Sequence, residues 1–543
     1  MLAVAYSDDR VAYEPVFRRS IPQYLQEVSN DYIITHNGKY DRILLKRYAL
    51  DFKIGFDTML AQYLLHPDRE IKLEKVYEQI TGEHKEDLVE VYNRVTGKKV
   101  KNLPEDWHEE IPLDQLETYT KADITATKTI FQVLEAEIDA SPIKDVFYSV
   151  EIPFLNILTE TEILGVKLDI PQLTKLRDAL QIDQTRLDQE LKILAEDENL
   201  NVNSTKQLQN LLFVKFRLDK IKKTKTGYST DSKTLEKLKH HPFVAKLLEF
   251  REVSKILSTY TDSLISQVDI NDRIHTNYNI CFTETNRLSS DHPNLQNIPV
   301  KGKYGQKIRN CFIADTEKVF LIVDFDQIEL RLLAHFTQDP NLKQWFAENK
   351  DIHQGTADMI AARLGKTFTR QQGKILNFSL MYGKTEWGFS KDWNVSVEEA
   401  KKIIDIYYEQ FPSVKAWKDQ QEFQMVEQRG WCKSIANIPL YVGDPMMAEP
   451  KDYAHMLRCA VNYPIQSSSQ DLMKYGVVAL HQKYGIIPLL LVHDELVYEL
   501  PNDKNVMQLK NQIVKTIEEE TRKRFGLAVP VKVSHKLSSA WQK

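Results

Sequence analysis

Two apolar segments that carry carboxylates at their ends place the strongest constraint on the fold of this chain. The first, VFLIVDF, is apolar and β-branched over residues 319–323 and ends in Asp324, a pattern typical of a buried strand. Apolar residues then recur at helical spacing, so Asp324 is expected where a strand passes into a helix. The second, PLLLVHDELVYEL, is interrupted by His493, Asp494 and Glu495, which predicts a tight β-hairpin with two acids at its turn.

These acids indicate a metal site. Burying a lone carboxylate costs several kcal/mol unless a cation or hydrogen bonds compensate. Acids on adjacent strand ends therefore favour a divalent cation, and hard oxygen ligands favour Mg²⁺. The alternative is that these acids are solvated turn residues. Either segment, taken alone, is compatible with that alternative.

A third segment, TRQQGKILNFSLMYGK, carries Arg370, Lys374, Phe378 and Tyr382 at intervals of four. On a helix each such step advances about 400°, so the four side chains form one slowly drifting stripe. The stripe is cationic at its start and aromatic at its end, whereas an ordinary core stripe is apolar throughout. A nucleoside triphosphate has the same polarity, with phosphates for the cations and a base and sugar for the rings. An amphipathic helix with cations at its edge is the alternative.

The length and composition indicate several globular domains. The chain has 543 residues, of which 42% are hydrophobic and 27% charged, enough for three or four domains with real cores. A net charge of −5 neither predicts nor excludes nucleic-acid binding, because the local arrangement of Lys and Arg decides that. The basic segment KIKKTKTG, residues 220–227, is either a solvated hairpin tip or a phosphate contact.

The sequence predicts a reducing compartment and no membrane partner. The longest apolar run, residues 486–492, is short and contains Pro488, so no spanning helix is expected. The start, MLAVAYSDDR, lacks the basic region and apolar stretch of a signal peptide. The four cysteines show no zinc spacing and no disulfide pattern: Cys281, Cys311, Cys432 and Cys459.

Five segments in order resemble the family A DNA polymerases, the bacterial DNA polymerase I group. They are TNRLSSDHPNLQNIP, DFDQIELR, RQQGKILNFSLMYG, RCAVNYPIQSSSQD and VHDE, and the segment VSKILSTYTDSL resembles the family's thumb. The resemblance implies an α+β multidomain fold, with an RNase H-like exonuclease-type domain followed by a right-hand polymerase of palm, fingers and thumb. The expected boundaries are 1–145 for the first domain, 146–280 for the thumb, 281–340 and 456–543 for the palm, and 341–455 for the fingers.

The resemblance implies a template-directed DNA polymerase that adds dNTPs to a primer 3′-OH. Asp324, Asp494 and the backbone carbonyl of Phe325 would hold two Mg²⁺ ions, for which Mn²⁺ is a possible substitute, with Glu495 as an accessory acid. Lys374 would donate a proton to the leaving pyrophosphate. The partners would be primer-template DNA and dNTPs, with the protein a monomer in the cytoplasm of a bacterial or phage-infected cell, associated with the nucleoid.

The same resemblance assigns residues to the two substrates. Glu329 would exclude ribonucleotides by occupying the space that a 2′-OH needs. The dNTP-binding residues would be Arg370, Lys374, Phe378, Tyr382, Glu329, His353 and Gln327. The DNA-binding residues would be Arg287, Gln296, Arg458, Asn462, Gln466 and His493, several of them reading minor-groove acceptors that lie in similar places for all base pairs.

The sequence departs from the family pattern at several places. Phe325 and Asp326 replace the usual Tyr and Ser, while Asn286, Ser379 and Ser467 each stand where Gly is usual. None of these changes removes a metal or phosphate ligand. They bear on substrate selectivity and speed more than on activity.

The first domain is expected not to proofread. It offers Asp41 in NGKYD, and Tyr119 and Asp123 in YTKAD, as an exonuclease remnant. The family's first strand, with two metal-binding acids in a DxE pattern, is absent, and Asp8 and Asp9 are not expected to replace those acids. Two-metal hydrolysis needs several converging carboxylates.

Two other functions compete with this reading. A single-subunit RNA polymerase shares the palm chemistry, but Glu329 and the QNIP and VHDE contexts argue against it. A catalytically inactive DNA clamp would be expected to have lost Asp324 or Asp494, and both are present.

Overall fold

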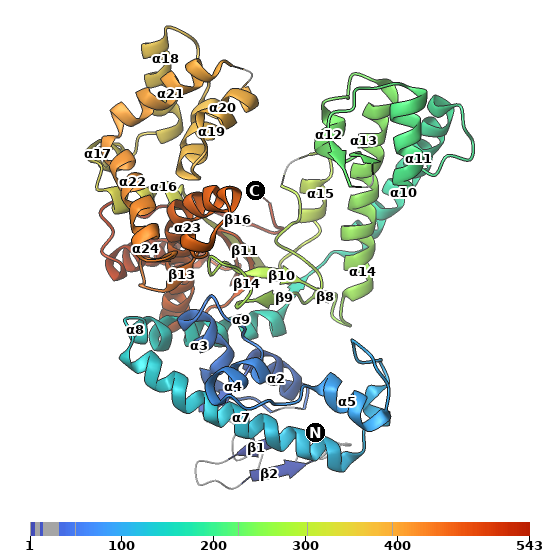
Figure 1. Ribbon diagram of the computed structural model, residues 1–543, viewed down its shortest axis with the longest axis vertical. Coiled ribbons are helices and arrows are strands. Elements are labelled where there is room, and N and C mark those ends of the chain that lie inside the picture. Colours follow the sequence, from blue (N-terminus) through green and yellow to red (C-terminus); the bar gives the residue numbers. More distant parts are fainter. Residues whose placement is uncertain are drawn as a thin grey trace.

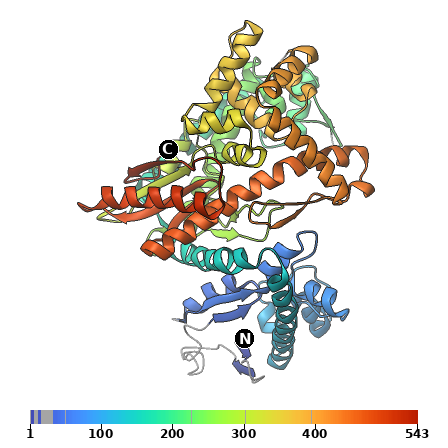
Figure 2. The ribbon, with the colours of Figure 1, turned by 90° about the vertical axis from the view of Figure 1, so that its left-hand side faces the viewer.

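A computed structural model describes residues 2–5, 11–14, 32–48, 50–225, 227–300, 302–393 and 395–542. Asp8 and Asp9 lie outside these described residues. In Figure 1 a small sheet lies at the centre, two helical lobes rise on either side of it, and the first domain lies beneath them. Figure 2 shows the first domain as a separate layer below the rest of the molecule.

The first domain mixes short strands with helices, as the sequence predicts. Strands β3 and β4 are parallel, with α2 connecting them, and β1 pairs with β2 in an antiparallel hairpin. The elements are β1 (Leu2–Ala5), β2 (Val11–Glu14), β3 (Tyr32–Thr35), α2 (Gly38–Lys46), β4 (Lys53–Asp57), α3 (Thr58–Leu65), α4 (Leu73–Thr81), α5 (Leu88–Thr96), α6 (Trp107–Glu110) and α7 (Leu113–Ala140).

The segment predicted as the thumb is mainly helical. Helix α8 (Lys144–Val146) spans the predicted boundary at 145/146, and a π-helical turn (Phe147–Glu151) and α9 (Ile152–Leu164) follow it beside the first domain. The helical lobe comprises α10 (Ile170–Ala195), α11 (Thr205–Asn210), α12 (Ser232–Glu236), α13 (Pro242–Lys255) and α14 (Ser263–Gln267), with π-helical turns at Leu211–Lys215 and Ile256–Asp262 and short strands β5 (Val166–Lys167), β6 (Lys223–Thr224), β7 (Gly227–Tyr228) and β8 (Arg273–Ile274). The basic segment at 220–227 includes β6 and the first residue of β7, and these two strands pair with each other.

The other lobe, predicted as the fingers, contains the aromatic and cationic stripe. Its elements are α17 (Pro340–Ala347), α18 (Ile352–Leu364), α19 (Arg370–Met381), α20 (Glu386–Trp393), α21 (Val397–Gln410), α22 (Pro412–Glu427), the hairpin β12 (Trp431–Lys433) and β13 (Pro439–Tyr441), and a 3₁₀ turn (Pro445–Met447). The predicted helix around Arg370 is confirmed as α19.

The central sheet has the strand order β14-β15-β11-β16. Strand β11 is antiparallel to both of its neighbours, and the predicted hairpin is confirmed as β14 and β15. The elements of this region are β9 (Asn277–Asn279), β10 (Ser289–Asp291), α15 (Gly305–Arg309), β11 (Lys318–Phe325), α16 (Ile328–Thr337), α23 (Pro450–Tyr484), β14 (Pro488–Val492), β15 (Glu495–Pro501), α24 (Val506–Arg524) and β16 (Val533–Ser538).

Strand β11 is buried on both faces, and alternate residues pack into two different cores. Val319, Leu321 and Val323 belong to a core shared with the fingers segment and the first domain. Phe320 and Ile322 belong to a second core, shared with the thumb segment. This division follows from the two-residue period of a strand.

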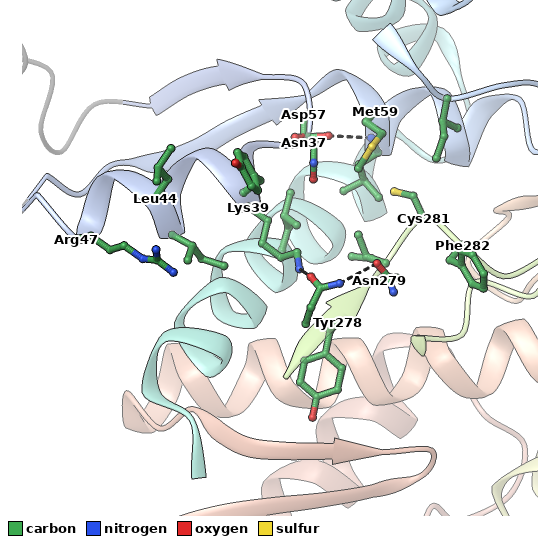
Figure 3. Close-up of a pocket in the computed structure, with 17 residues that line it drawn as sticks. Asn37, Lys39, Leu44, Arg47, Asp57, Met59, Tyr278, Asn279, Cys281 and Phe282 are labelled. Atoms are coloured by element: carbon green, nitrogen blue, oxygen red, sulfur yellow. Dashed lines mark hydrogen bonds between the residues drawn. The ribbon is translucent and has the colours of Figure 1, made fainter. Parts of the chain in front are cut away.

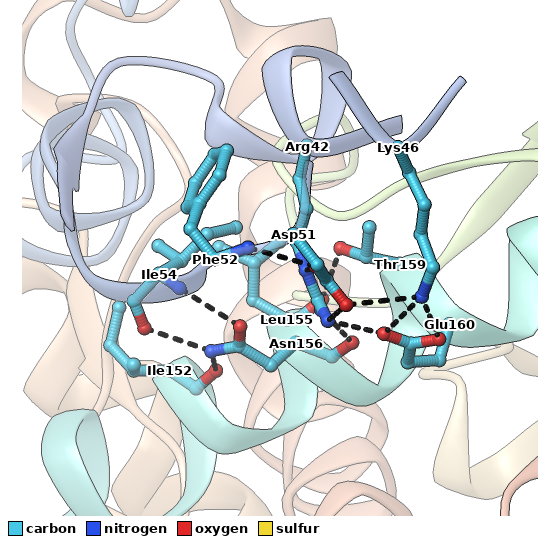
Figure 4. Close-up of polar contacts among 10 residues, drawn as sticks. All are labelled: Arg42, Lys46, Asp51, Phe52, Ile54, Ile152, Leu155, Asn156, Thr159 and Glu160. Atoms are coloured by element: carbon cyan, nitrogen blue, oxygen red, sulfur yellow. Dashed lines mark hydrogen bonds and ion pairs between the residues drawn. The ribbon is translucent and has the colours of Figure 1, made fainter. Parts of the chain in front are cut away.

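The first domain is fixed to α9 by polar contacts (Figure 4). The Asn156 side chain accepts from the Ile54 N–H at 2.9 Å and donates to the Ile54 carbonyl at 2.8 Å, as a neighbouring strand would. Arg42 bonds Asp51 at 2.8 Å and also pairs with Glu160. Because Asn156 satisfies backbone groups at an edge of β4, it replaces a missing strand partner.

We predict that Asn156→Ala destabilises the first domain by about 2–4 kcal/mol, because the two buried Ile54 groups lose their partner. Hydrogen exchange at the Ile54 amide and the denaturant midpoint of the first unfolding transition measure this. Asn199→Ala is the control, since Asn199 is exposed. Unchanged exchange at Ile54 would contradict the assignment.

Candidate functional site

The acids predicted at strand ends converge at one place. Asp324, near the end of β11, is the register partner of Glu495 at the start of β15. Asp494 occupies the turn before Glu495, and the Phe325 N–H donates to the Asp494 carbonyl at 3.1 Å. A cavity of about 350 Å³ is lined by both aspartates together with Gln296, Arg309, His493 and Glu495.

The buried Glu495 is engaged by two residues that the sequence reasoning missed. Its Oε1 accepts from Arg309 Nη1 at 3.0 Å and from Trp541 Nε1 at 2.6 Å. The Arg309 guanidinium lies 3.9 Å from the centre of the Trp541 ring, and burial lowers the pKa of Arg309. These partners come from α15 and from beyond β16, so no local pattern points to them. Arg309 and Trp541 therefore hold one carboxylate oxygen of Glu495, and that oxygen is occupied by protein partners.

The residues at this cavity fit a hard divalent cation. The half-buried Asp324 and Asp494 supply carboxylate oxygens, and both line the same cavity. Carboxylate and carbonyl oxygens are the donors that Mg²⁺ accepts. Within the described ranges, no group of three or more His, Cys, Asp or Glu side chains is arranged as a metal site.

Three side chains of the α19 stripe, Lys374, Phe378 and Tyr382, lie next to one another, while Arg370 at the start of the helix pairs with Asp351 at 2.7 Å. Thr369 caps the helix, and its side chain and that of Gln372 form a capping box. Lys374 Nζ lies 5.8 Å from the centre of the Phe378 ring, and the Phe378 and Tyr382 rings stack with their centres 6.2 Å apart. Tyr382 is the residue immediately after the last turn of α19, so the predicted stripe runs the length of the helix.

Helix α18 packs closely against α19 and brings His353 to the stripe. A side chain at Gly373 would place its Cβ 2.1 Å from the His353 carbonyl oxygen, so only glycine permits this approach. The His353 and Phe378 ring centres are 5.6 Å apart. Burial, and then the charges of Arg370 and Lys374, lower the pKa of His353 to about 4. Its imidazole is thus neutral at pH 7.

Glu329 connects the stripe to the strand that carries Asp324. The Tyr382 hydroxyl donates to Glu329 Oε2 at 2.6 Å, and Arg287 Nη2 donates to Glu329 Oε1 at 2.5 Å. Glu329 lies in the first turn of α16, five residues after Asp324. Burial, followed by the charges of Glu329 and Asp494, raises the pKa of Tyr382, which keeps its hydroxyl a donor.

The other predicted substrate-binding residues lie on several different elements. Gln327 precedes α16 with φ 52°, and its Oε1 is buried without a hydrogen-bond partner among the described residues. Gln296 is buried and donates to the Leu491 carbonyl at 3.2 Å. Three predicted DNA-binding residues lie at intervals of four along α23: Arg458, Asn462 and Gln466. His493 lies exposed in the turn of the β14–β15 hairpin.

The first domain contains a separate group of acids. Burial, then the charges of Asp57 and Asp123, raise the pKa of Asp41 to about 7. Asp57 caps α3 and accepts from the Gly38 N–H at 2.7 Å. Lys85 Nζ lies 2.5 Å from Asp123 Oδ1 and 4.7 Å from the centre of the Tyr119 ring, and its side chain is only 5% exposed. The sequence reasoning missed Asp57 and Lys85.

A second cavity, of about 570 Å³, separates the first domain from the central region. Figure 3 shows Leu44 of α2 and Arg47, the residue that follows this helix, on one side of it and Cys281 and Phe282 on the other. Its lining includes Asp57 but neither Asp41 nor Asp123, so it borders the acid group only through Asp57.

Comparisons with known proteins agree with this geometry. Residues 170–543 match the model of DNA polymerase family A, and residues 3–139 match a 3′-5′ exonuclease model. The chain belongs to DNA polymerase family A. The predicted α+β architecture, an exonuclease-type domain followed by a right-hand polymerase, is confirmed.

Several relatives span the chain. DNA polymerase I of Synechocystis sp. is 32% identical over 94% of this chain and 53% of its own length. DNA polymerase I of Bacillus subtilis is 33% identical over 90% and 55%. The chain thus spans about half the length of these relatives. The POL domain of Pol1 from M. smegmatis, in complex with DNA primer-template and dNTP, superposes with a TM-score of 0.83 at 25% identity, covering 99% of this chain and 92% of that one.

In the part of the family A chain that the structure describes, no helix has the length and apolar character to cross a membrane.

We predict that the His353 imidazole titrates near pH 4 instead of its ordinary value of 6.5. The unfolded chain then binds the proton more readily, so this group's contribution to the free energy of unfolding is present above about pH 6.5 and falls as the pH drops toward 4. An NMR titration of histidine-labelled protein measures the midpoint, with His353→Gln identifying the resonance by its loss. A midpoint near 6.5 would contradict the environment described.

Proposed function

We propose that this chain is a template-directed DNA polymerase that adds dNTPs to a primer 3′-OH. The observation that carries the proposal is the Tyr382–Glu329 hydrogen bond of 2.6 Å. It joins the aromatic end of the α19 stripe to the segment that follows Asp324. The groups suited to a triphosphate and the groups suited to metal therefore belong to one site.

The metals would be held by Asp324, Asp494 and the Phe325 carbonyl. When bound, two Mg²⁺ ions supply activation of the 3′-OH and stabilisation of the triphosphate charge. Glu495 holds this edge of the sheet through Arg309 and Trp541, and we assign it a positioning role.

The remaining residues bind and orient the substrates. Arg370 and Lys374 attract the phosphates, and Lys374 donates a proton to the leaving pyrophosphate. Neutral His353 donates a hydrogen bond to the phosphates rather than a charge. Phe378 packs on the sugar and Tyr382 lies beside the template base.

Glu329 would distinguish deoxyribonucleotides from ribonucleotides. Its two oxygens are held by Tyr382 and Arg287, so it cannot turn away to admit a 2′-OH without breaking both bonds. This argues against an RNA polymerase. Minor-groove contacts would come from the DNA-binding set that includes Arg287. We further propose a cytoplasmic monomer; the four free thiols favour a reducing compartment.

We predict that Asp324→Asn or Asp494→Asn lowers single-nucleotide incorporation by at least roughly a thousandfold, because each removes a metal-binding charge. Primer extension with dNTPs and with NTPs measures the rates, and a binding titration checks that the primer-template is still bound. Asp503→Asn, at an exposed acid beyond the sheet, is the control. Near-normal turnover in either variant would refute the assignment, and wild-type preference for NTPs would refute the function.

We propose that the first domain does not proofread. The Lys85 ammonium lies 2.5 Å from Asp123 Oδ1 and neutralises that carboxylate. A metal ion at Asp123 would therefore have to compete with this lysine. Asp57 uses its oxygens to cap α3 and to hold Gly38 and Thr35. The acids near Asp41 are thus largely committed to protein partners.

We predict no shortening of a 3′-labelled primer with a terminal mismatch in Mg²⁺ or Mn²⁺ without dNTPs. Two-metal hydrolysis needs carboxylates free to bind both ions. A proofreading-competent polymerase serves as the positive control. Shortening that disappears in Asp123→Ala would overturn the proposal.

A further inference from the structure

The loop that carries Arg287 lies between β9 and β10 and is held from inside. Asn286 has φ 58°, in the left-handed region that Gly and Asn adopt most readily. The Thr283 hydroxyl donates to the Arg287 carbonyl at 2.8 Å, which closes the loop on itself. The conformation of this loop sets where the Arg287 guanidinium lies.

Asn286 completes a fully buried charge pair. Lys474 Nζ donates to the two oxygens of Glu151 at 3.0 and 2.9 Å and to Asn286 Oδ1 at 2.8 Å. The side chains of Lys474 and Glu151 are both 0% exposed. An ammonium has three protons, so the three acceptors satisfy it completely. A glycine at 286, the residue usual in the family, would leave one of these donors without its acceptor.

The first domain holds the other end of the loop. The Tyr63 hydroxyl, on α3, donates to the Thr283 carbonyl at 2.5 Å. Burial raises the pKa of Tyr63, so this hydroxyl remains a donor at any working pH. Glu151 itself immediately precedes α9, the helix on which the first domain is docked.

The contacts continue from the loop into the polymerase site. Arg287 bonds Glu329 at 2.5 Å, and Glu329 accepts from Tyr382 at 2.6 Å. A continuous series of contacts therefore connects Tyr63, through the loop that contains Thr283 and Arg287, to Glu329. From Glu329 it continues to Tyr382 at the end of the α19 stripe.

We propose that the first domain serves the polymerase reaction by fixing the Arg287 loop, with Tyr63 and Asn286 as positioning residues. This inference rests on the proposed function, in which Arg287 binds minor-groove acceptors. It gives the domain a role that needs no nuclease chemistry. Tyr63 and Asn286 touch no substrate and act through Arg287.

The test measures how strongly incorporation depends on a single minor-groove acceptor. Primers contain guanine or 3-deazaguanine, which lacks the N3 acceptor, at each of the last five positions in turn. The ratio of single-turnover rates, guanine over 3-deazaguanine, is taken at the position with the largest wild-type effect. Arg287→Ala defines the ratio when the guanidinium is absent.

We expect a wild-type ratio of roughly tenfold or more, since a hydrogen bond to a charged group is lost. Tyr63→Phe and Asn286→Gly should each reduce this ratio at least roughly threefold, toward that of Arg287→Ala, with the dNTP dissociation constant changed less than about twofold. Tyr77→Phe is the control, because its hydroxyl lies on the same domain and bonds the exposed Glu83. It should keep the wild-type ratio.

The outcomes separate the inference from the function it rests on. No extension of a natural primer by the wild type would refute the polymerase function. Extension with a wild-type ratio near one would refute the minor-groove contact of Arg287, and the inference with it, while the polymerase function would stand. An unchanged ratio in both variants would overturn the positioning role alone. A uniform loss of rate on both primers leaves the ratio unchanged and therefore also counts against it. The two variants act on different bonds, so one that fails to fold leaves the other to decide.

Discussion

The burial of β11 on both faces is the constraint on which the rest of this structure depends. Its alternate side chains pack into two cores, one shared with the thumb segment and one with the fingers segment and first domain. A shift of one residue in register would exchange those two sets of side chains. The same register sets Asp324 opposite Glu495 and beside the turn that holds Asp494. The acids are thus positioned by hydrophobic packing at a distance from them.

A second constraint acts where α18 and α19 meet. The absence of a side chain at Gly373 lets the helix backbones approach, and this brings His353 against the aromatic part of the stripe. Burial there keeps the imidazole neutral at pH 7. The cationic character of the helix is consequently carried by Arg370 and Lys374, in its amino-terminal half, and the aromatic rings of Phe378 and Tyr382 follow them.

The sequence was sufficient for features that depend on local periodicity. The strand before Asp324, the acidic hairpin turn and the stripe on α19 follow from spacings of two and four residues, and the motif order indicated the architecture. Arg309, Trp541, Asp57, Lys85 and Tyr63 were missed. Each acts through a partner distant in sequence or on a separate element, as Trp541 does with Glu495 at 2.6 Å. Such contacts depend on how elements pack, and no single segment encodes them.

The first domain shares a buried apolar cluster with the central sheet. Phe52, Ile54 and Phe56 lie in the same buried cluster as Val319 and Leu321 of β11. Removing the domain would expose that cluster, at a cost of about 1.5–3 kcal/mol for each large apolar side chain returned to water. Apolar side chains carry this packing, so it does not depend on the acids of the domain. The Lys85–Asp123 ion pair, with Nζ and Oδ1 2.5 Å apart, neutralises one half-buried carboxylate of the domain.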